Sequence, residues 1–328
     1  TGFFGGFKEI IAPHVGELEE NTSRELVRLM RQYGKPIAVH TSFAQAPFRS
    51  MEILNENGIL LTPSSERAAQ CLAYMAKFAT RREKLALARP LPAIKADTAA
   101  ARTLIEGVKQ AGRKNLLETE ARDLLSLYGI ALPPAKLAKT PDEAIAAAKA
   151  VGYPVALKIV SPEIIHKSDA GGILIDLGDE KAVREGFAAV IANVGKVSRP
   201  EKVLGVLVAP MAPKGQECII GMIRNPQFGA VLMFGLGGIF VEVLKDVSFR
   251  VIPPTDLDLE EMVHEIKGYP LLAGVRGQKP KDTGILKDIL QRLAQLAGDH
   301  PEIAEVDINP VIVHEKGASV VDARVIIT

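Results

Sequence analysis

One lysine lies inside a short apolar run of the chain, and a histidine and a pair of glycines follow it closely. The run is Val155–Val160 and the lysine is Lys158; a cation is costly to bury there unless it meets an anion, for which phosphate is the obvious candidate. His166 could accept or hand on a phosphoryl group. Gly171 and Gly172 would let backbone N–H groups approach phosphate oxygens closely. The stretch predicts a phosphate site, and the alternative is a surface hairpin with a snorkelling lysine.

A second set of polar side chains lies near the end of the chain. Asp307 and Asn309 are two residues apart, so in a strand they point to the same face. Asp322 returns on the partner strand of the predicted hairpin. Mg²⁺ prefers such oxygen ligands, with nucleotide phosphates completing its octahedron. The spacing therefore indicates a magnesium site, and the alternative is the polar outer face of an edge hairpin.

Two further stretches could contact a nucleotide. The apolar strand Val206–Met211 ends near Glu217, and together they could wall an adenine and hold a ribose; a plain core strand is the other interpretation. Phe234–Glu242 contains GLGG, which allows close backbone approach to a ligand or simply forms a tight turn. It lacks the GK[ST] of a Walker loop and the GxGxxG of a dinucleotide fingerprint.

The elements that must position these side chains follow from the hydrophobic pattern. Residues 1–86 alternate between helical and strand-like runs, which predicts a parallel sheet with helices on its faces and a first strand preceding residue 1. Arg89–Pro92 is typical of a linker. A second alternating region begins at Leu116, and from Val203 the pattern is mostly β. We therefore expect a first domain over 1–88, a linker over 89–114 and two lobes over 115–202 and 203–328.

Length and composition exclude several classes of protein. A chain of 328 residues is long for one core. Its net charge of +1 gives no basic excess for nucleic-acid binding, and no apolar run reaches the roughly 18 residues of a membrane span. The two cysteines lie far apart and suggest a reducing compartment, so we expect a cytoplasmic protein.

The order of these features resembles the ATP-grasp fold, in which two α+β lobes clamp a nucleotide. The segments KIVSPEIIHKSDAGG, FGLGGIFVEVLKDVSFR and EVDINPVIV are similar to the NDP-forming acyl-CoA synthetases, over about Leu116–Thr328. The segments KPIAVHTSF and PSSERAAQCLA resemble the second flavodoxin-like succinyl-CoA-ligase domain of the same family. The resemblance implies an α/β and α+β protein: a flavodoxin-like domain cut at its start, followed by a two-lobed ATP-grasp domain.

The resemblance also implies a role for each site residue. His166 would relay phosphate to the nucleotide, ATP or ADP. Asn309 and Asp322 would bind Mg²⁺, with Asp307 as a further candidate. The remaining residues would contact the nucleotide, with the glycines over the phosphates and the acid near the hinge: Lys158, Gly171, Gly172, Val208, Ala209, Met211 and Glu217.

The family reaction converts acyl-CoA, ADP and phosphate into free acid, CoA and ATP through a phosphohistidine. A complete enzyme also has a CoA-binding domain and a first phosphohistidine loop, and no segment here matches either. We therefore expect this chain to meet CoA and the acyl substrate through further domains or a partner subunit, in a hetero- or homo-oligomer. Two alternatives stay open: a nucleotide-sensing module of an acetyltransferase-like protein, and an ATP-grasp carboxylate–amine ligase.

Overall fold

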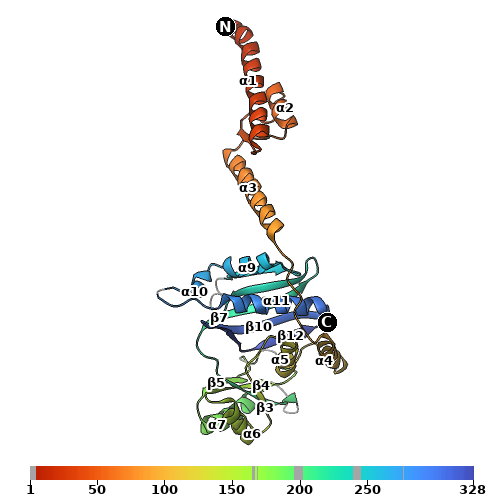
Figure 1. Ribbon diagram of the computed structural model, residues 1–328, viewed down its shortest axis with the longest axis vertical. Helices are drawn as coiled ribbons and strands as arrows, with labels where there is room; N and C mark the ends of the chain where they lie inside the picture. Colours follow the sequence, from red (N-terminus) through yellow and green to blue (C-terminus); the bar gives the residue numbers. More distant parts are fainter. Residues whose placement is uncertain (1–4, 165–166, 168, 196–201, 239–244, 276) are drawn as a thin grey trace. The chain divides into compact units, whose positions relative to one another are not determined.

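The computed structural model describes residues 5–164, 167, 169–195, 202–238, 245–275 and 277–328. The chain divides into two compact units, Thr1–Ala88 and Arg89–Thr328 (Figure 1). Each unit is described by itself below. None of the helices in the described ranges is long and apolar enough to cross a membrane.

The first unit is a small parallel sheet with three helices. Strands β1 and β2 pair in parallel, with Ala38 opposite Leu60, which confirms the parallel sheet expected there. Its apolar core includes Val27, Ile53 and Ile59. The elements are α1 Gly5–Tyr33, β1 Ala38–His40, α2 Arg49–Glu56, β2 Leu60–Thr62 and α3 Ser65–Leu87.

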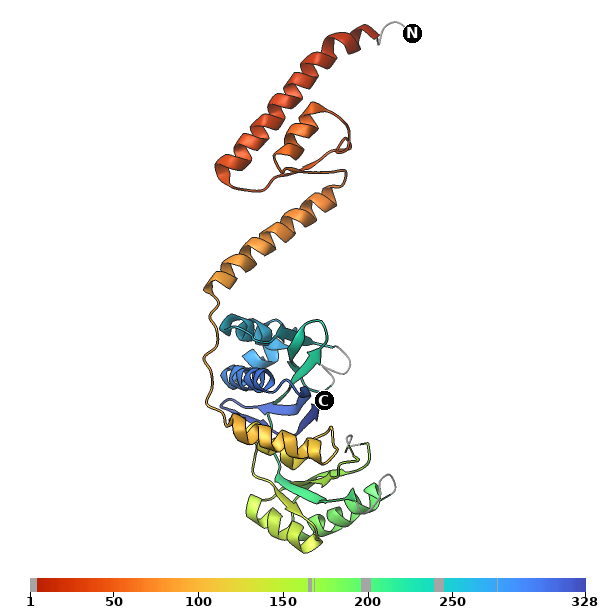
Figure 2. The same ribbon diagram turned by 90° about the vertical axis from the view of Figure 1, so that its right-hand side faces the viewer.

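The second unit contains two sheets, and the smaller one forms the first lobe. Its four strands are antiparallel in the order β3-β6-β4-β5, and α6 and α7 pack on one face (Figures 1 and 2). Thr140 caps α6 by accepting the Glu143 N–H, a role that threonine commonly has at the start of a helix. The elements are β3 Lys136–Ala138, α6 Pro141–Val151, β4 Val155–Val160, β5 Ile173–Leu177, α7 Glu180–Val194 and β6 Gly205–Pro210.

The larger sheet forms the second lobe. Its order is β11-β10-β7-β8-β9, and β12 also pairs with β10. Helices from both ends of the unit pack on this sheet in one apolar core. The elements are α4 Thr98–Gln110, α5 Glu118–Leu127, β7 Gln216–Asn225, β8 Gly229–Leu236, β9 Val247–Val251, α9 Asp256–His264, α10 Tyr269–Ala273, α11 Thr283–Asp299, β10 Ile303–Val313, β11 Ala318–Val320 and β12 Ala323–Ile327.

Two boundaries differ from those expected from the sequence. Strand β6, placed in the second lobe by the expected break at residue 203, belongs to the first, because it pairs with β4 on one side and β3 on the other. The expected linker 89–114 contains α4, whose inward side chains are buried in the second-lobe core. Strand pairing decides the position of β6, and burial against distant segments decides that of α4. The local hydrophobic pattern of the sequence shows neither of these interactions.

Candidate functional site

The two lobes of the second unit face each other across a cavity of about 450 Å³. A neighbouring cavity of about 240 Å³ shares Ile173, Asn309 and Asp322 with it, so the two form one continuous cleft. The larger part is lined mainly by polar atoms of α5, the β4–β5 loop and the β10–β12 hairpin. The smaller part is lined mainly by apolar side chains, which makes the cleft suited to a ligand with one charged and one apolar end.

Lys158 lies on β4, between β5 and β6, with only 5% of its side chain exposed. Its Nζ donates to Glu118 Oε1 at 3.0 Å and to the Val321 carbonyl at 2.7 Å, and Asp322 Oδ2 lies 3.7 Å away. The predicted need for an anion is therefore confirmed, but in this structure the anion is a carboxylate. The alternative of a snorkelling surface lysine is wrong, because every residue of β4 is buried.

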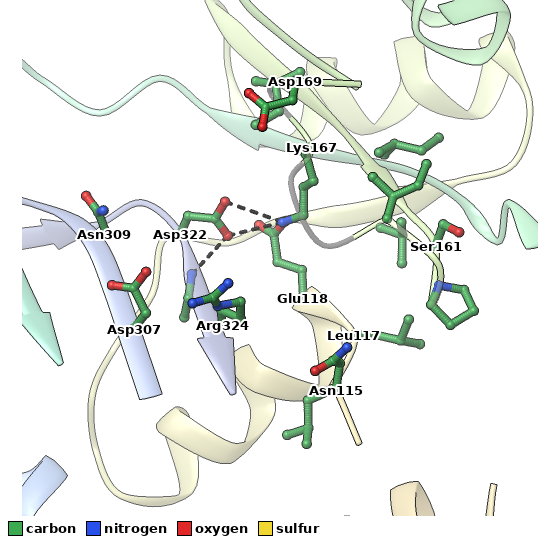
Figure 3. A pocket seen from close by; sticks show the side chains of 17 residues that line it. Asn115, Leu117, Glu118, Ser161, Lys167, Asp169, Asp307, Asn309, Asp322 and Arg324 are labelled. Atoms are coloured by element: carbon green, nitrogen blue, oxygen red, sulfur yellow. Dashed lines mark hydrogen bonds and ion pairs between the residues drawn. The ribbon is translucent and has the colours of Figure 1, made fainter. Parts of the chain in front are cut away.

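Lys167, which the sequence patterns did not single out, lines the larger cavity (Figure 3) and shares the Glu118 carboxylate with Lys158. Its Nζ donates to Glu118 Oε2 and lies 3.3 Å from both oxygens of Asp322. Burial acts to lower the pKa of Lys167, but the charges of Glu118 and Asp322 outweigh it, so the pKa is raised. The ammonium therefore stays protonated and adds a cation to the cleft.

The carboxylate between the two lysines, Glu118, was also missed. It is the first residue of α5, its side chain is 1% exposed, and each of its oxygens accepts from one lysine. Neither lysine that donates to its carboxylate is a local neighbour, since the nearer of the two, Lys158, is 40 residues away. Only the folded arrangement of α5 against the first lobe shows its place.

The predicted metal ligands Asp307, Asn309 and Asp322 all line the larger cavity. The Asn309 N–H donates to the Asp322 carbonyl at 3.1 Å, so the hairpin brings these two residues together as expected. Asp307 Oδ1 is buried without a hydrogen-bond partner. Burial raises the pKa of Asp307, the charges of Glu305 and Asp322 add to the effect, and Arg324 opposes it.

This oxygen set fits a magnesium ion. A buried carboxylate oxygen with no donor is costly and gains from a cation, and Mg²⁺ takes few protein oxygens and completes its octahedron with water and phosphate. The described part of the chain contains no group of three His, Cys, Asp or Glu side chains arranged for a metal. An ion here would therefore depend on the Asn309 amide and on a bound phosphate.

The hinge residues divide into two groups. Ala209 and Met211 line the smaller, apolar cavity. Val208 is fully buried in the core of the first lobe, on the opposite face of β6, so its side chain does not reach the cleft. Glu217 is exposed and lines neither cavity, and its carbonyl accepts the Gly237 N–H at 2.8 Å. The structure therefore does not bring the Val208 and Glu217 side chains to the site.

The glycine pair is required by the loop itself. The Gly172 N–H donates to the Lys167 carbonyl at 2.7 Å, and a Cβ at Gly172 would lie 2.6 Å from Ile159 Cγ2. Gly171 has a φ of 61°, which favours glycine. Neither glycine lines either of the two cavities that make up the cleft. His166 lies outside the described residues.

Comparison with known proteins places the chain in a family. The ATP-grasp domain family matches residues 107–327. The chain is 50% identical over 229 residues to the acetate–CoA ligase [ADP-forming] I subunit beta of Pyrococcus furiosus, covering 70% of this chain and 98% of that protein. The chain belongs to the ATP-grasp family of ADP-forming acyl-CoA synthetases. The family resemblance and the fold class predicted from the sequence are thereby confirmed.

Longer members of this synthetase family match more of the chain. The 4-hydroxybutyrate–CoA ligase [ADP-forming] of Nitrosopumilus maritimus is 39% identical over 302 residues, which is 92% of this chain but 43% of that protein. The chain therefore corresponds to the nucleotide-binding, phosphoryl-transfer part of larger ligases.

A solved member of the synthetase family shares the fold. It is the acetyl-coenzyme A synthetase 1 of Ca. Korarchaeum cryptofilum, in complex with coenzyme A and Ca-AMPCP, with 47% identity and a TM-score of 0.67; the match covers 70% of this chain and 100% of that chain. A further structure of the same protein contains coenzyme A and Mg-AMPPCP, and its phosphohistidine segment points towards the nucleotide-binding site.

Proposed function

We propose that this chain binds ATP or ADP with Mg²⁺ in the cleft between its lobes and carries out the nucleotide half of a reversible acyl-CoA synthetase reaction. The observation that carries the proposal is the pair of lysines, Lys158 and Lys167, facing the Asp322 carboxylate in one cleft. Two ammonium groups suit the β- and γ-phosphates, because phosphates that lose their hydration water on binding are stabilised by nearby positive charge.

The cleft suggests how the nucleotide lies. The adenine would contact Ala209 and Met211 in the apolar part, and the phosphates would reach the lysines. Asp322, Asn309 and Asp307 would hold Mg²⁺, which when bound neutralises phosphate charge. Gly171 and Gly172 would then act by shaping the loop, because the Gly172 N–H already donates to the Lys167 carbonyl and is not available to a phosphate. Val208 would contact the nucleotide through its backbone.

The phosphoryl relay is assigned to His166. Ile164 and Lys167, on either side of it in the chain, both line the cavity, and the Korarchaeum synthetase with Mg-AMPPCP has a phosphohistidine segment directed at its nucleotide site. In the direction of ATP use, the bond between the γ-phosphorus and the bridging oxygen breaks, a P–N bond to the imidazole forms, and ADP leaves. The reverse step makes ATP.

The full reaction needs more than this chain holds. We infer that CoA and the acyl substrate bind to further domains or to a partner subunit, in a hetero- or homo-oligomer, as the names of the beta-subunit relative and of the CoA-bound structure suggest. A cytoplasmic location is part of the same proposal and agrees with the two free cysteines, Cys71 and Cys218.

Trapping the phosphorylated protein tests the relay. The chain is incubated with Mg²⁺ and ATP labelled at the γ-phosphate, and acid-labile, base-stable label is measured. We expect label in the wild type. We also expect label in the control variant His264→Ala, because His264 lines neither cavity. We expect none in His166→Ala.

The outcomes separate the three functions. Binding of nucleotide without label in the wild type would favour a sensing module. Release of labelled phosphate only when an amine substrate is present would favour a carboxylate–amine ligase. Full labelling of His166→Ala would contradict the assigned relay residue.

A further inference from the structure

Both lysines of the cleft share one buried carboxylate. Glu118 accepts from Lys158 through Oε1 at 3.0 Å and from Lys167 through Oε2. The Glu118 side chain is 1% exposed. Charge-assisted hydrogen bonds at a site shielded from solvent are short and directional. A single side chain therefore fixes the position of one ammonium group relative to the other.

The shared carboxylate also joins the two lobes. The lysines come from the first lobe, on β4 and in the loop before β5, whereas Glu118 begins α5 of the second lobe. The N-terminus of a helix favours a negative side chain, and α5 is fixed by fully buried Leu124 and Leu125 in the second-lobe core. Glu118 therefore places first-lobe cations against the second-lobe carboxylate of Asp322.

The arrangement leaves donor capacity for a ligand. An ammonium group has three N–H donors. Lys158 uses two of them, on Glu118 and on the Val321 carbonyl, and Asp322 Oδ2 is 3.7 Å away, beyond a good hydrogen bond. One donor of Lys158 can therefore take a phosphate oxygen without breaking the Glu118 contact.

We propose that Glu118 is a positioning residue of the phosphate site, holding Lys158 and Lys167 as a preformed pair of cations. This inference rests on the proposed nucleotide-binding function. Glu118 does not itself touch the nucleotide; it acts through the two lysines. In its absence the lysines would approach Asp322 instead, and the phosphates would have to break those contacts before binding.

The test compares ligands that differ in phosphate number. Binding of ATP, ADP and adenosine to the full chain with Mg²⁺ is measured by calorimetry, with adenosine measured by displacement. In Glu118→Gln we expect the Kd of ATP and ADP to rise about 10- to 100-fold, the range for losing one charge-assisted contact. Adenosine, which has no phosphate, should keep its Kd.

The matched control is Glu120→Gln, two residues along the same helix. Glu120 pairs with Arg113 at 2.6 Å and accepts the Leu117 N–H, so its loss weakens the start of α5 without touching either lysine. We expect Glu120→Gln to lower thermal stability and to leave the Kd of ADP unchanged. If Glu118→Gln alone does not fold, the double variant Glu118→Gln with Lys167→Met removes the cation left unpaired. Its Kd for ADP is compared with that of the single variant Lys167→Met. We expect the double variant to bind ADP more weakly, because the effect of Glu118 through Lys158 persists.

Three results would overturn the proposal. An equal loss for adenosine and ATP would show a merely structural role. Tighter ATP binding in Glu118→Gln would show that Glu118 competes with phosphate for the lysines. An unchanged Kd for every ligand would show that Asp322 suffices. Failure of the wild type to bind ADP at all is a separate result, because it removes the proposed function itself.

Discussion

At the residue scale, the cleft pairs each buried cation with an acid from a different part of the chain. Lys158 and Lys167 together face Glu118 and Asp322, and the partly buried Arg122 also interacts electrostatically with both acids. Removing one member would leave a buried charge without its partner. The folding free energy lost in this way is larger than the net stabilisation that the intact pair provides. An incoming phosphate would add negative charge beside Asp322, and Mg²⁺ held there would neutralise it.

Asp307 has one buried carboxylate oxygen without a hydrogen-bond partner, and the pH dependence of its effect on stability can be predicted. Its pKa is raised in the folded chain, chiefly by burial, so its contribution to stability is fully present below the unfolded value, near 3.8, and is lost as the pH rises through the folded value. Asp307→Asn stays neutral and avoids that loss. In metal-free buffer we expect the Tm advantage of the variant to be small at acidic pH and to grow towards neutral pH.

Scanning fluorimetry from acidic to neutral pH measures this difference, with the wild type at each pH as reference. Adding Mg²⁺ and ADP should reverse the order near neutral pH, because a ligand that binds only the folded state stabilises it and the variant has lost a ligand oxygen. A Tm difference that does not change with pH would contradict the cause assigned to the raised pKa.

At the element scale, sequence patterns predicted individual strands and the terminal hairpin but not which strands pair with β6. The apolar run around Lys158 correctly predicted β4, and the hairpin correctly placed Asp322 beside Asn309, because both depend on neighbours in sequence. The position of β6 depends on pairing with β3 and β4. Glu118 reaches Lys158 across 40 residues, so no local pattern could reveal it.

The loop between β4 and β5 depends on a close approach at Gly172. A Cβ there would lie 2.6 Å from Ile159 Cγ2 and 3.1 Å from the Lys167 carbonyl. Gly172→Ala should therefore lower the free energy of unfolding by about 1–3 kcal/mol, as overpacking does, and should displace Lys167 and weaken ADP binding. Chemical denaturation and calorimetry measure the two effects.

Gly178→Ala is the matched control for this loop. A Cβ at Gly178 meets nothing within 4 Å, so the variant should keep both stability and the Kd of ADP. If Gly172→Ala were as stable as Gly178→Ala and bound ADP equally well, the close packing of the loop on Ile159 would not be what requires glycine there.

At the scale of the whole molecule, the second unit begins well before the first family-matched residue. The Arg89 N–H donates to Asp256 Oδ1 at 2.9 Å, and Ile94 exchanges two hydrogen bonds with the Gln295 amide. Helix α4 follows and buries Ile105 and Val108 in the second-lobe core. The segment expected to be a linker is thus part of the unit that contains the cleft.

Two shortened chains test this boundary. A chain starting at Arg89 should unfold cooperatively and bind Mg-ADP with a Kd within about twofold of the full chain, because the described residues that line the two cavities all belong to the second unit. A chain starting at Gly112 loses α4 and should be much less stable, since burial of Ile105 and of Val108 contributes about 1.5–3 kcal/mol each. Thermal unfolding and calorimetry on both chains measure this. Equal stability of the two would show that α4 is dispensable, whereas loss of ADP binding in the Arg89 chain would show that the first unit takes part in the nucleotide site.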